Sequence, residues 1–261
     1  MQRKIRLVIT AALATAFAVV ECQLSYLVQK GNEVTAAMYS AVVLAVVFAM
    51  LSIVRTPTLE YNLIRLGLGV TLLADYFLVL CNPAKEIEGV AVFCVVQMAY
   101  FAALAVSDKS RVRRTVHISV RAGLCVLIVP VALLVLGDSV DALAILSAVY
   151  YVNLVCNMAF AFADFRRWWL LGLGLFAFAL CDASIGFDFL VNSYIGAAEG
   201  SLLWRIVHSG LNLAWIFYIP CLTMISLSTH FPFGRDERLS SVVGSGLPVT
   251  EENGAPKTDG K

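Results

Sequence analysis

The stretch LGLGVTLLADYFL, residues 66–78, decides how this chain folds, because it is an apolar run that contains a single carboxylic acid. It lies within a longer apolar segment, residues 62–81, which has about the 20 residues that a helix needs to cross the hydrocarbon layer of a bilayer. Hydrophobic residues make up 60% of the chain and charged residues only 14%. Soluble domains are typically about half apolar and about a quarter charged. The composition therefore predicts an integral membrane protein.

Apolar segments of this kind recur along the whole chain. The first of them, which begins at Ile5, is interpreted as a spanning helix and not as a signal peptide, because it is long and Glu21 follows it in place of a cleavage site with small residues. Continuous helices satisfy every backbone polar group inside lipid. The predicted fold class is an all-α membrane protein, a bundle of eight transmembrane helices. The predicted spans are residues 5–28, 35–54, 62–81, 88–106, 116–136, 141–162, 168–190 and 203–228.

Basic residues gather in alternate connections between these spans. Three lie at the N-terminus, one (Arg55) in the second loop, four in the fourth loop, two in the sixth and four after the last span. The first and third loops have one each, Lys30 and Lys85, and the fifth loop has none. Because cytoplasmic loops carry the excess of Lys and Arg, both termini are predicted to be cytoplasmic. We expect a transmembrane domain over residues 1–230 in the bacterial cytoplasmic membrane. Residues 231–261, rich in Ser, Gly, Glu and Lys, predict a disordered cytoplasmic tail.

Two aspartates stand inside predicted spans. Asp75 lies in the second half of the quoted stretch, and Asp182 occupies a similar place in the seventh span. Ionisable groups in spanning helices are costly and usually functional. Both residues lie at nearly the same distance from the starts of their spans, and those spans run in the same direction. We therefore expect the two carboxyl groups to share one level in the outer half of the bilayer and to be functional.

Other polar residues are predicted at a similar depth, where they would line a cavity open to the outer leaflet. His208 and Asp188 lie near the interface, where hydration alone would explain them. A buried asparagine such as Asn157 often ties helices together. Of the seven cysteines none is at metal-ligand spacing, so no metal is predicted, and Cys22 and Cys81 could form a disulfide near the outer surface. The supporting residues of the expected site are Tyr76, Gln97, Tyr100, Tyr150, Asn153, Asp188 and His208.

Two carboxyl groups that lie close together can share one proton, so that one acts as an acid and the other as a base. That chemistry suits acid–base hydrolysis of a lipid-like substrate. A proton-coupled transporter or a small-ligand membrane receptor would use the same polar cavity, and a non-catalytic scaffold subunit is a third reading. The residue pattern by itself leaves these classes open.

Three segments resemble signatures of the YhhN (lysoplasmalogenase) family of integral membrane proteins. Residues 66–78 are similar to its first signature, and residues 173–182, LGLFAFALCD, to its second, an apolar run that ends in Ser-Asp. Residues 88–93, EGVAVF, resemble the G-x-x-x-F entry into the helix between them. This chain is a divergent member in three places. Ala74 stands where Gly is usual, Cys181 where Ser is usual, and Gln97 where many members have His.

The resemblance implies hydrolysis of the vinyl ether bond of lysoplasmalogens to a fatty aldehyde and a glycerophospho-headgroup. It implies that Asp75 and Asp182 carry out acid–base catalysis, with Gln97 or Asn153 helping to direct water. The implied partner is a lysophospholipid within the bilayer. No cofactor and no nucleic acid partner are expected.

Overall fold

The computed structural model describes residues 2–31, 34–51, 58–137, 140–191, 199–207 and 211–230. Within these ranges the chain is helical and no strand occurs. The predicted tail, residues 231–261, and His208 lie outside the described residues. The elements are α1 (Gln2–Lys30), α2 (Val34–Met50), α3 (Leu59–Asp75), the π-helical segment η1 (Tyr76–Leu80), α4 (Glu86–Ser107), α5 (Arg111–Leu136), α6 (Ala142–Ala163), α7 (Phe165–Leu190), α8 (Leu202–Val207) and α9 (Leu213–Ser228).

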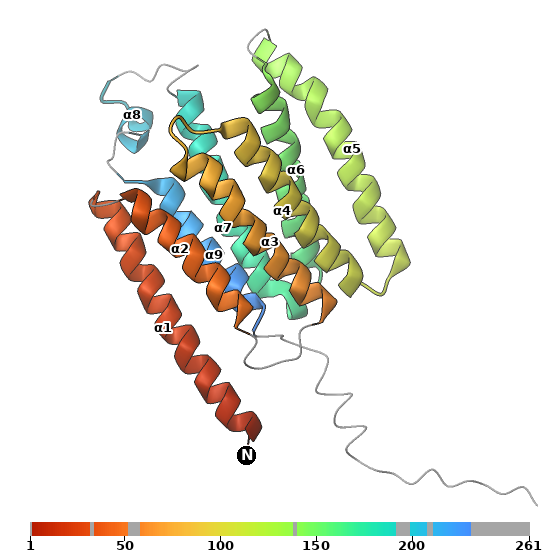
Figure 1. The fold of residues 1–261 in the computed structure, drawn as a ribbon. Helices are drawn as coiled ribbons and strands as arrows, with labels where there is room; N and C mark the ends of the chain where they lie inside the picture. Colours follow the sequence, from red (N-terminus) through yellow and green to blue (C-terminus); the bar gives the residue numbers. More distant parts are fainter. Residues whose placement is uncertain are drawn as a thin grey trace, which may run out of the picture.

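Six helices form a closed ring. In order around the ring, α2 packs on α3, α3 on α4, α4 on α6, α6 on α7, α7 on α9, and α9 returns to α2. The helices run roughly side by side along one axis (Figure 1). Short connections such as residues 81–85 between η1 and α4 make sequence neighbours antiparallel. The ring encloses the main apolar core of the molecule.

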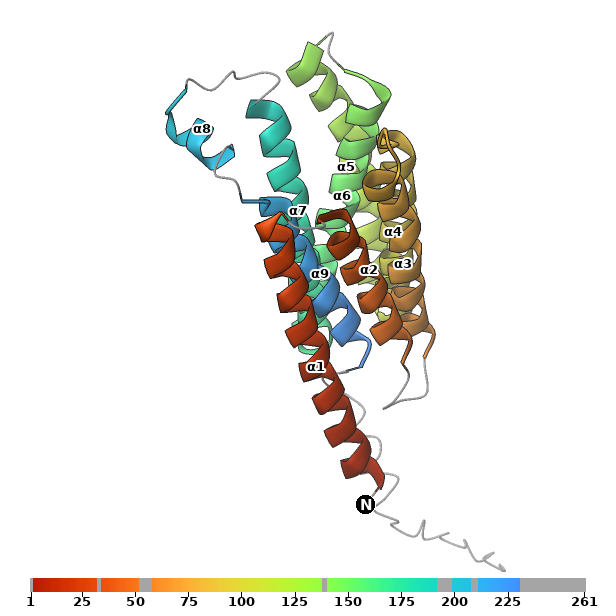
Figure 2. The same ribbon diagram turned by 60° about the vertical axis from the view of Figure 1, so that its left-hand side comes forward.

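The remaining helices lie outside this ring. α1 packs against α2 and α9, and its N-terminal part extends past the end of the bundle, as Figure 2 shows. α5 packs against α6 on the opposite side of the molecule (Figure 1). The short helix α8 stands apart from the bundle at the end where α7 finishes.

The outer surface of the bundle is apolar. On α5 the side chains of Val126 and Leu134 are 75% and 85% exposed. Large contiguous apolar surfaces are rare on soluble monomers, so this one requires lipid around it. Six helices of the described residues, α1, α3 with η1, α4, α5, α6 and α7, are long and apolar enough to cross a membrane, and α2 and α9 are shorter apolar helices.

Glycines permit the closest contacts between ring helices. A Cβ at Gly174 of α7 would lie 3.2 Å from the backbone nitrogen of Ile225 and 3.3 Å from the backbone oxygen of Cys221, both in α9. A Cβ at Gly67 of α3 would meet the ring of Tyr100 in α4. Gly174 therefore lets α7 approach the backbone of α9 closely, and Gly67 leaves room between α3 and α4 for the ring of Tyr100.

The prediction that residues 203–228 form one continuous helix is wrong. The structure divides it into α8 and α9, and residues 211 and 212 are not helical. The side chain of Asn212 accepts a hydrogen bond from the backbone N–H of Trp215, which makes Asn212 the N-cap of α9. Gln29 of α1 fixes this cap, because its side chain bonds both the N–H (2.9 Å) and the C=O (3.1 Å) of Asn212. Hydropathy alone does not register such a cap.

The possible disulfide between Cys22 and Cys81 is not formed in the structure. Cys22 and Cys81 are free, as are the other five cysteines. Cys22 lies on the exposed face of α1, and Cys81 follows η1.

Candidate functional site

Asp75 and Asp182 each accept a hydrogen bond from a tyrosine of another helix. The hydroxyl of Tyr218 in α9 donates to Oδ2 of Asp75 over 2.7 Å. The hydroxyl of Tyr150 in α6 donates to Oδ2 of Asp182 over the same distance. Asp75 is 3% exposed, the two tyrosines are buried, and Asp182 is half-buried. The site thus has two equivalent halves, each a carboxyl group held by a phenol.

The two halves lie beside each other inside the ring of helices. The carboxyl groups of Asp75 and Asp182 are close enough to interact electrostatically. The buried thiols of Cys181 in α7 and Cys221 in α9 each interact with both carboxyl groups. Four ring helices, α3, α6, α7 and α9, therefore supply a common polar centre.

Phe178 sets the spacing of this centre. It lies one turn before Asp182 on α7 and is 2% exposed. Its ring centroid is 5.5 Å from that of Tyr218 and 6.4 Å from that of Tyr150. Phe93 of α4 packs on it edge-on at 5.4 Å. These rings bury apolar surface around the phenols and limit the rotation of both tyrosines.

The backbone changes its winding directly after Asp75. α3 ends at this residue and continues as η1, a π-helical turn. Such turns are rare and frequently occur at functional sites, because the extra residue rotates the side chains that follow. Tyr76, which was predicted to support the site, is 46% exposed and lies outside the buried centre.

Tyr100 belongs to the site. It is 1% exposed, lies within electrostatic range of Asp75 and contacts Thr71, one turn before Asp75 on α3. The absence of a side chain at Gly67 makes room for its ring. α4 thereby contributes a third phenol, next to those of Tyr150 and Tyr218.

Gln97 and Asn153 belong to a second polar cluster. Asn157 of α6 donates to the side-chain oxygen of Gln97 over 2.9 Å, and Arg121 of α5 donates to Asn153 (3.1 Å) and Asn157 (2.5 Å). Among the described residues, the hydrogen bonds of Gln97 and Asn153 go to this cluster, to the sulfur of Cys125 and to the helix backbone, and none joins them to Asp75 or Asp182.

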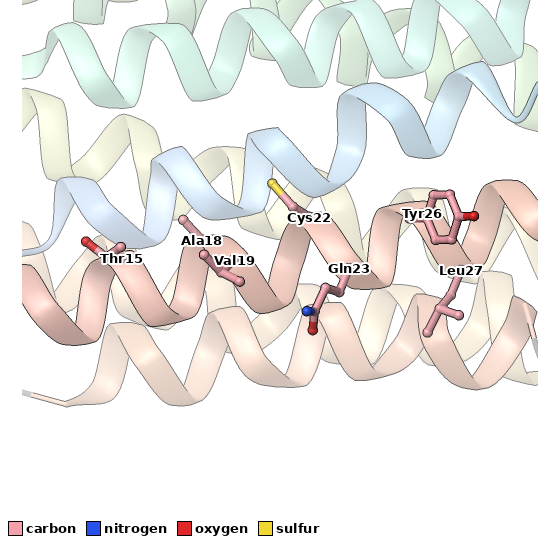
Figure 3. A pocket seen from close by; sticks show the side chains of 7 residues that line it. All are labelled: Thr15, Ala18, Val19, Cys22, Gln23, Tyr26 and Leu27. Atoms are coloured by element: carbon pink, nitrogen blue, oxygen red, sulfur yellow. The ribbon is translucent and has the colours of Figure 1, made fainter.

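The structure places the last predicted residue, Asp188, on the exposed face of α7 beyond Asp182. The expected polar cavity also differs from the hollows observed. An open hollow of about 670 Å³ is lined by side chains that all come from α1, among them Cys22 and Tyr26. Figure 3 shows these side chains. Neither this hollow nor a smaller one near Asp164 is lined by the two aspartates. Within the described residues no three His, Cys, Asp or Glu side chains are grouped to hold a metal ion.

The sequence reasoning missed Tyr218 and Arg121. Arg121 carried a usable signal, because an arginine within the predicted span 116–136 is as costly there as an aspartate. Tyr218 carried none, since tyrosine is common in membrane helices and its partner lies 143 positions away in the chain.

The fold and this site define a helical integral membrane protein with a buried pair of carboxylic acids between its helices. Residues 33–207 match the model of the YhhN family, and the chain belongs to that family. The match runs from α2 to α8 and includes both aspartates, whereas α9, which supplies Tyr218, lies beyond it. No curated protein and no solved structure matches the chain.

Proposed function

We propose that this protein is a membrane-embedded hydrolase that cleaves the vinyl ether bond of lysoplasmalogens, with Asp75 and Asp182 as its acid and base. One observation carries the proposal. In a member of the YhhN family, two carboxyl groups lie within electrostatic range of each other inside the helix ring, and each is held by its own tyrosine. Paired carboxyl groups are the usual means of hydrolysing bonds through an oxocarbenium-like centre.

The chemistry needs one proton donor and one proton acceptor. One aspartic acid protonates the outer carbon of the vinyl ether, and positive charge develops on the carbon bonded to oxygen. The other carboxylate accepts a proton from water as the water oxygen bonds to that carbon. The resulting hemiacetal then breaks its C–O bond to the glycerol and releases a fatty aldehyde and the glycerophospho-headgroup. Water is the only co-reactant.

The phenols have a defined part in this scheme. Tyr218 and Tyr150 each bind one carboxyl oxygen and hold the group in orientation, so that its other oxygen is directed to substrate or water. Phe178 and Phe93 keep the surroundings apolar, which strengthens electrostatic interactions within the site.

The proposed setting is a chain that crosses the bacterial cytoplasmic membrane eight times, with both termini in the cytoplasm. Six long apolar helices and the shorter α2 and α9 would be the eight spans. In this arrangement the lysophospholipid reaches the site from within the bilayer.

Aldehyde release from a lysoplasmalogen by the purified protein tests the proposal. Asp75→Asn and Asp182→Asn should each lower the rate by about 100-fold or more, the usual contribution of a general acid or base. Tyr218→Phe and Tyr150→Phe should lower it by about tenfold or more, since each removes one hydrogen bond to a carboxyl group.

Asp141→Asn is the matched control for these variants. Asp141 caps α6 through the N–H of Ala144 and is exposed, and asparagine is an equally good cap. Its rate should equal that of the wild-type protein. Full activity in both aspartate variants, or no aldehyde from the wild-type protein, refutes the proposal.

A further inference from the structure

In the part of the chain that the structure describes, a buried arginine of α5 has no ion-pair partner. Arg121 is 7% exposed and lies within the span Arg111–Leu134. Its side chain donates to the neutral amides of Asn153 and Asn157, and its guanidinium carbon lies 4.0 Å from the centre of the Phe101 ring. Its electrostatic neighbours are the thiols of Cys125 and Cys156 and the imidazole of His117, and neither Asp75 nor Asp182 is among them. Within the described residues its positive charge is uncompensated.

Arg121 also fixes the direction of a chain of hydrogen bonds. A guanidinium group only donates, so the amide of Asn157 must turn its oxygen toward Arg121 and its NH2 group toward α4. That NH2 group donates to the side-chain oxygen of Gln97 (2.9 Å) and to its backbone oxygen (2.8 Å). The NH2 group of Gln97 is consequently turned away from Asn157.

The series of hydrogen bonds from Arg121 through Asn157 ends at the NH2 group of Gln97, which has no acceptor among the described residues. Gln97 is 0% exposed, and its Nε2 has no hydrogen-bond partner among the described residues. The Nε atom of Arg121 is also buried and has no hydrogen-bond partner among the described residues. Buried donors without acceptors are costly. An anionic oxygen at Gln97 would accept from its NH2 group and would also compensate the nearby charge of Arg121.

We propose that Gln97, oriented through Asn157 by Arg121, binds the phosphodiester of a single-chain phospholipid. Gln97 is the residue that touches the ligand, and Arg121 is a positioning residue that also supplies positive charge. If the proposed function holds, this lipid is the substrate, and the inference then names how its headgroup is recognised.

The location of Gln97 agrees with this assignment. Gln97 lies one turn before Tyr100 on α4, and Tyr100 is within electrostatic range of Asp75. Three helical positions correspond to a rise of about 4.5 Å. In a lysoplasmalogen the vinyl ether oxygen and the phosphate are joined by a single glycerol unit. Sites for the two groups must therefore be near each other, and Tyr100, one turn from Gln97 and within electrostatic range of Asp75, is the residue that links them.

Binding of two matched probes to the purified full-length protein, in a detergent without charge or phosphate, tests this inference. The probes are a 1-O-alkyl-glycero-3-phosphocholine, which has no vinyl ether to hydrolyse, and the corresponding 1-O-alkylglycerol, which lacks the phosphate. The wild-type protein should bind the phosphate-bearing probe about tenfold more tightly. Gln97→Leu and Arg121→Gln should abolish that preference and leave binding of the alkylglycerol unchanged. Arg111→Gln, the same change at an exposed position of α5, should retain the preference.

Gln97→Glu keeps the test decisive if removal of Arg121 prevents folding. It preserves the size of the side chain and adds a carboxylate that compensates Arg121 and repels phosphate. Its unfolding midpoint should equal or exceed that of the wild-type protein, while the preference for the phosphate-bearing probe is lost.

Equal binding of both probes by the wild-type protein overturns the inference, and so does a preference that survives in Gln97→Leu. Displacement of the phosphate-bearing probe by inorganic phosphate overturns the assignment to a lipid headgroup. The inference and the proposed function fail separately. A phosphate preference in a protein that releases no aldehyde supports the inference alone, and aldehyde release without the preference supports the hydrolase alone.

Discussion

Replacement of Gly174 by alanine tests how closely α7 and α9 must approach. The new Cβ would lie 2.7 Å from Cγ1 of Ile225, 3.2 Å from its backbone nitrogen and 3.3 Å from the backbone oxygen of Cys221. A side chain can rotate away from such a contact, but two backbone atoms of a helix cannot. The two helices must therefore separate, which would also move Tyr218 of α9 relative to Asp75.

The expected loss of stability follows from two opposed effects. Alanine is favoured over glycine inside a helix by about 1 kcal/mol. Overpacking of a well-packed contact costs about 1–3 kcal/mol. Gly186→Ala, on the same helix, isolates the first effect, because its Cβ would meet nothing within 4 Å. Gly174→Ala should therefore be less stable than Gly186→Ala by about 1–3 kcal/mol.

Equilibrium unfolding of the purified protein in mixed micelles, with an increasing fraction of a denaturing detergent, gives the two free energies of unfolding. Gly186→Ala should be as stable as the wild-type protein or slightly more so. Equal free energies for the two alanine variants would refute the close packing of α7 on α9.

Two further predictions concern the ends of the helices at the side where α3 begins. Arg167→Ala should lower the free energy of unfolding by about 1 kcal/mol, because the Arg167 side chain bonds Glu60 at 2.6 Å and both side chains are largely shielded from solvent. Arg113→Ala breaks a longer and more exposed contact with Asp108 and should change the free energy of unfolding by less than about 0.5 kcal/mol. Equal effects of the two variants would contradict this prediction. Burial lowers the pKa of His230, beyond the end of α9, and Arg65 lowers it further, although the bond to the backbone oxygen of Phe48 partly opposes the shift. Because the unfolded chain then binds a proton more readily than the folded one, stability should be fully present above about pH 6.5 and fall as the pH is lowered through that value. His230→Gln should flatten the dependence of the unfolding midpoint on pH, and an unchanged slope would count against this assignment.

Much of the fold could be predicted from sequence, and the reason is visible in particular segments. The apolar runs 62–81 and 88–106 correspond closely to α3 with η1 and to α4, because lipid accepts only long stretches whose backbone bonds are internal. The failure at residues 203–228 has the opposite cause. The break there depends on Asn212 and on its partner Gln29, which is 183 positions away in the chain.

The candidate site was also predicted only in part: its two aspartates were recognised from the sequence, but their neighbours were not all assigned correctly. Asp75 and Asp182 were recognised because a carboxyl group within an apolar run is conspicuous. The assignment of Gln97 and Asn153 to the same centre rested on similar depth alone, and depth does not specify which neighbour a helix face meets. Their observed partners, Asn157 and Arg121, depend on how α4, α5 and α6 are rotated about their axes.

The sequence by itself determined that this chain is a helical membrane protein and that two aspartates are among the residues that are costly to bury in its spans, because the hydrophobic effect and the bilayer thickness act on composition and length. Only the tertiary structure decided which groups satisfy those aspartates. The ring of helices brings Tyr218 to Asp75 and Tyr150 to Asp182. It directs Arg121 to a separate cluster with Gln97. Hydrogen bonds act over about 3 Å, so they depend on the rotation and spacing of whole helices, which no local pattern encodes.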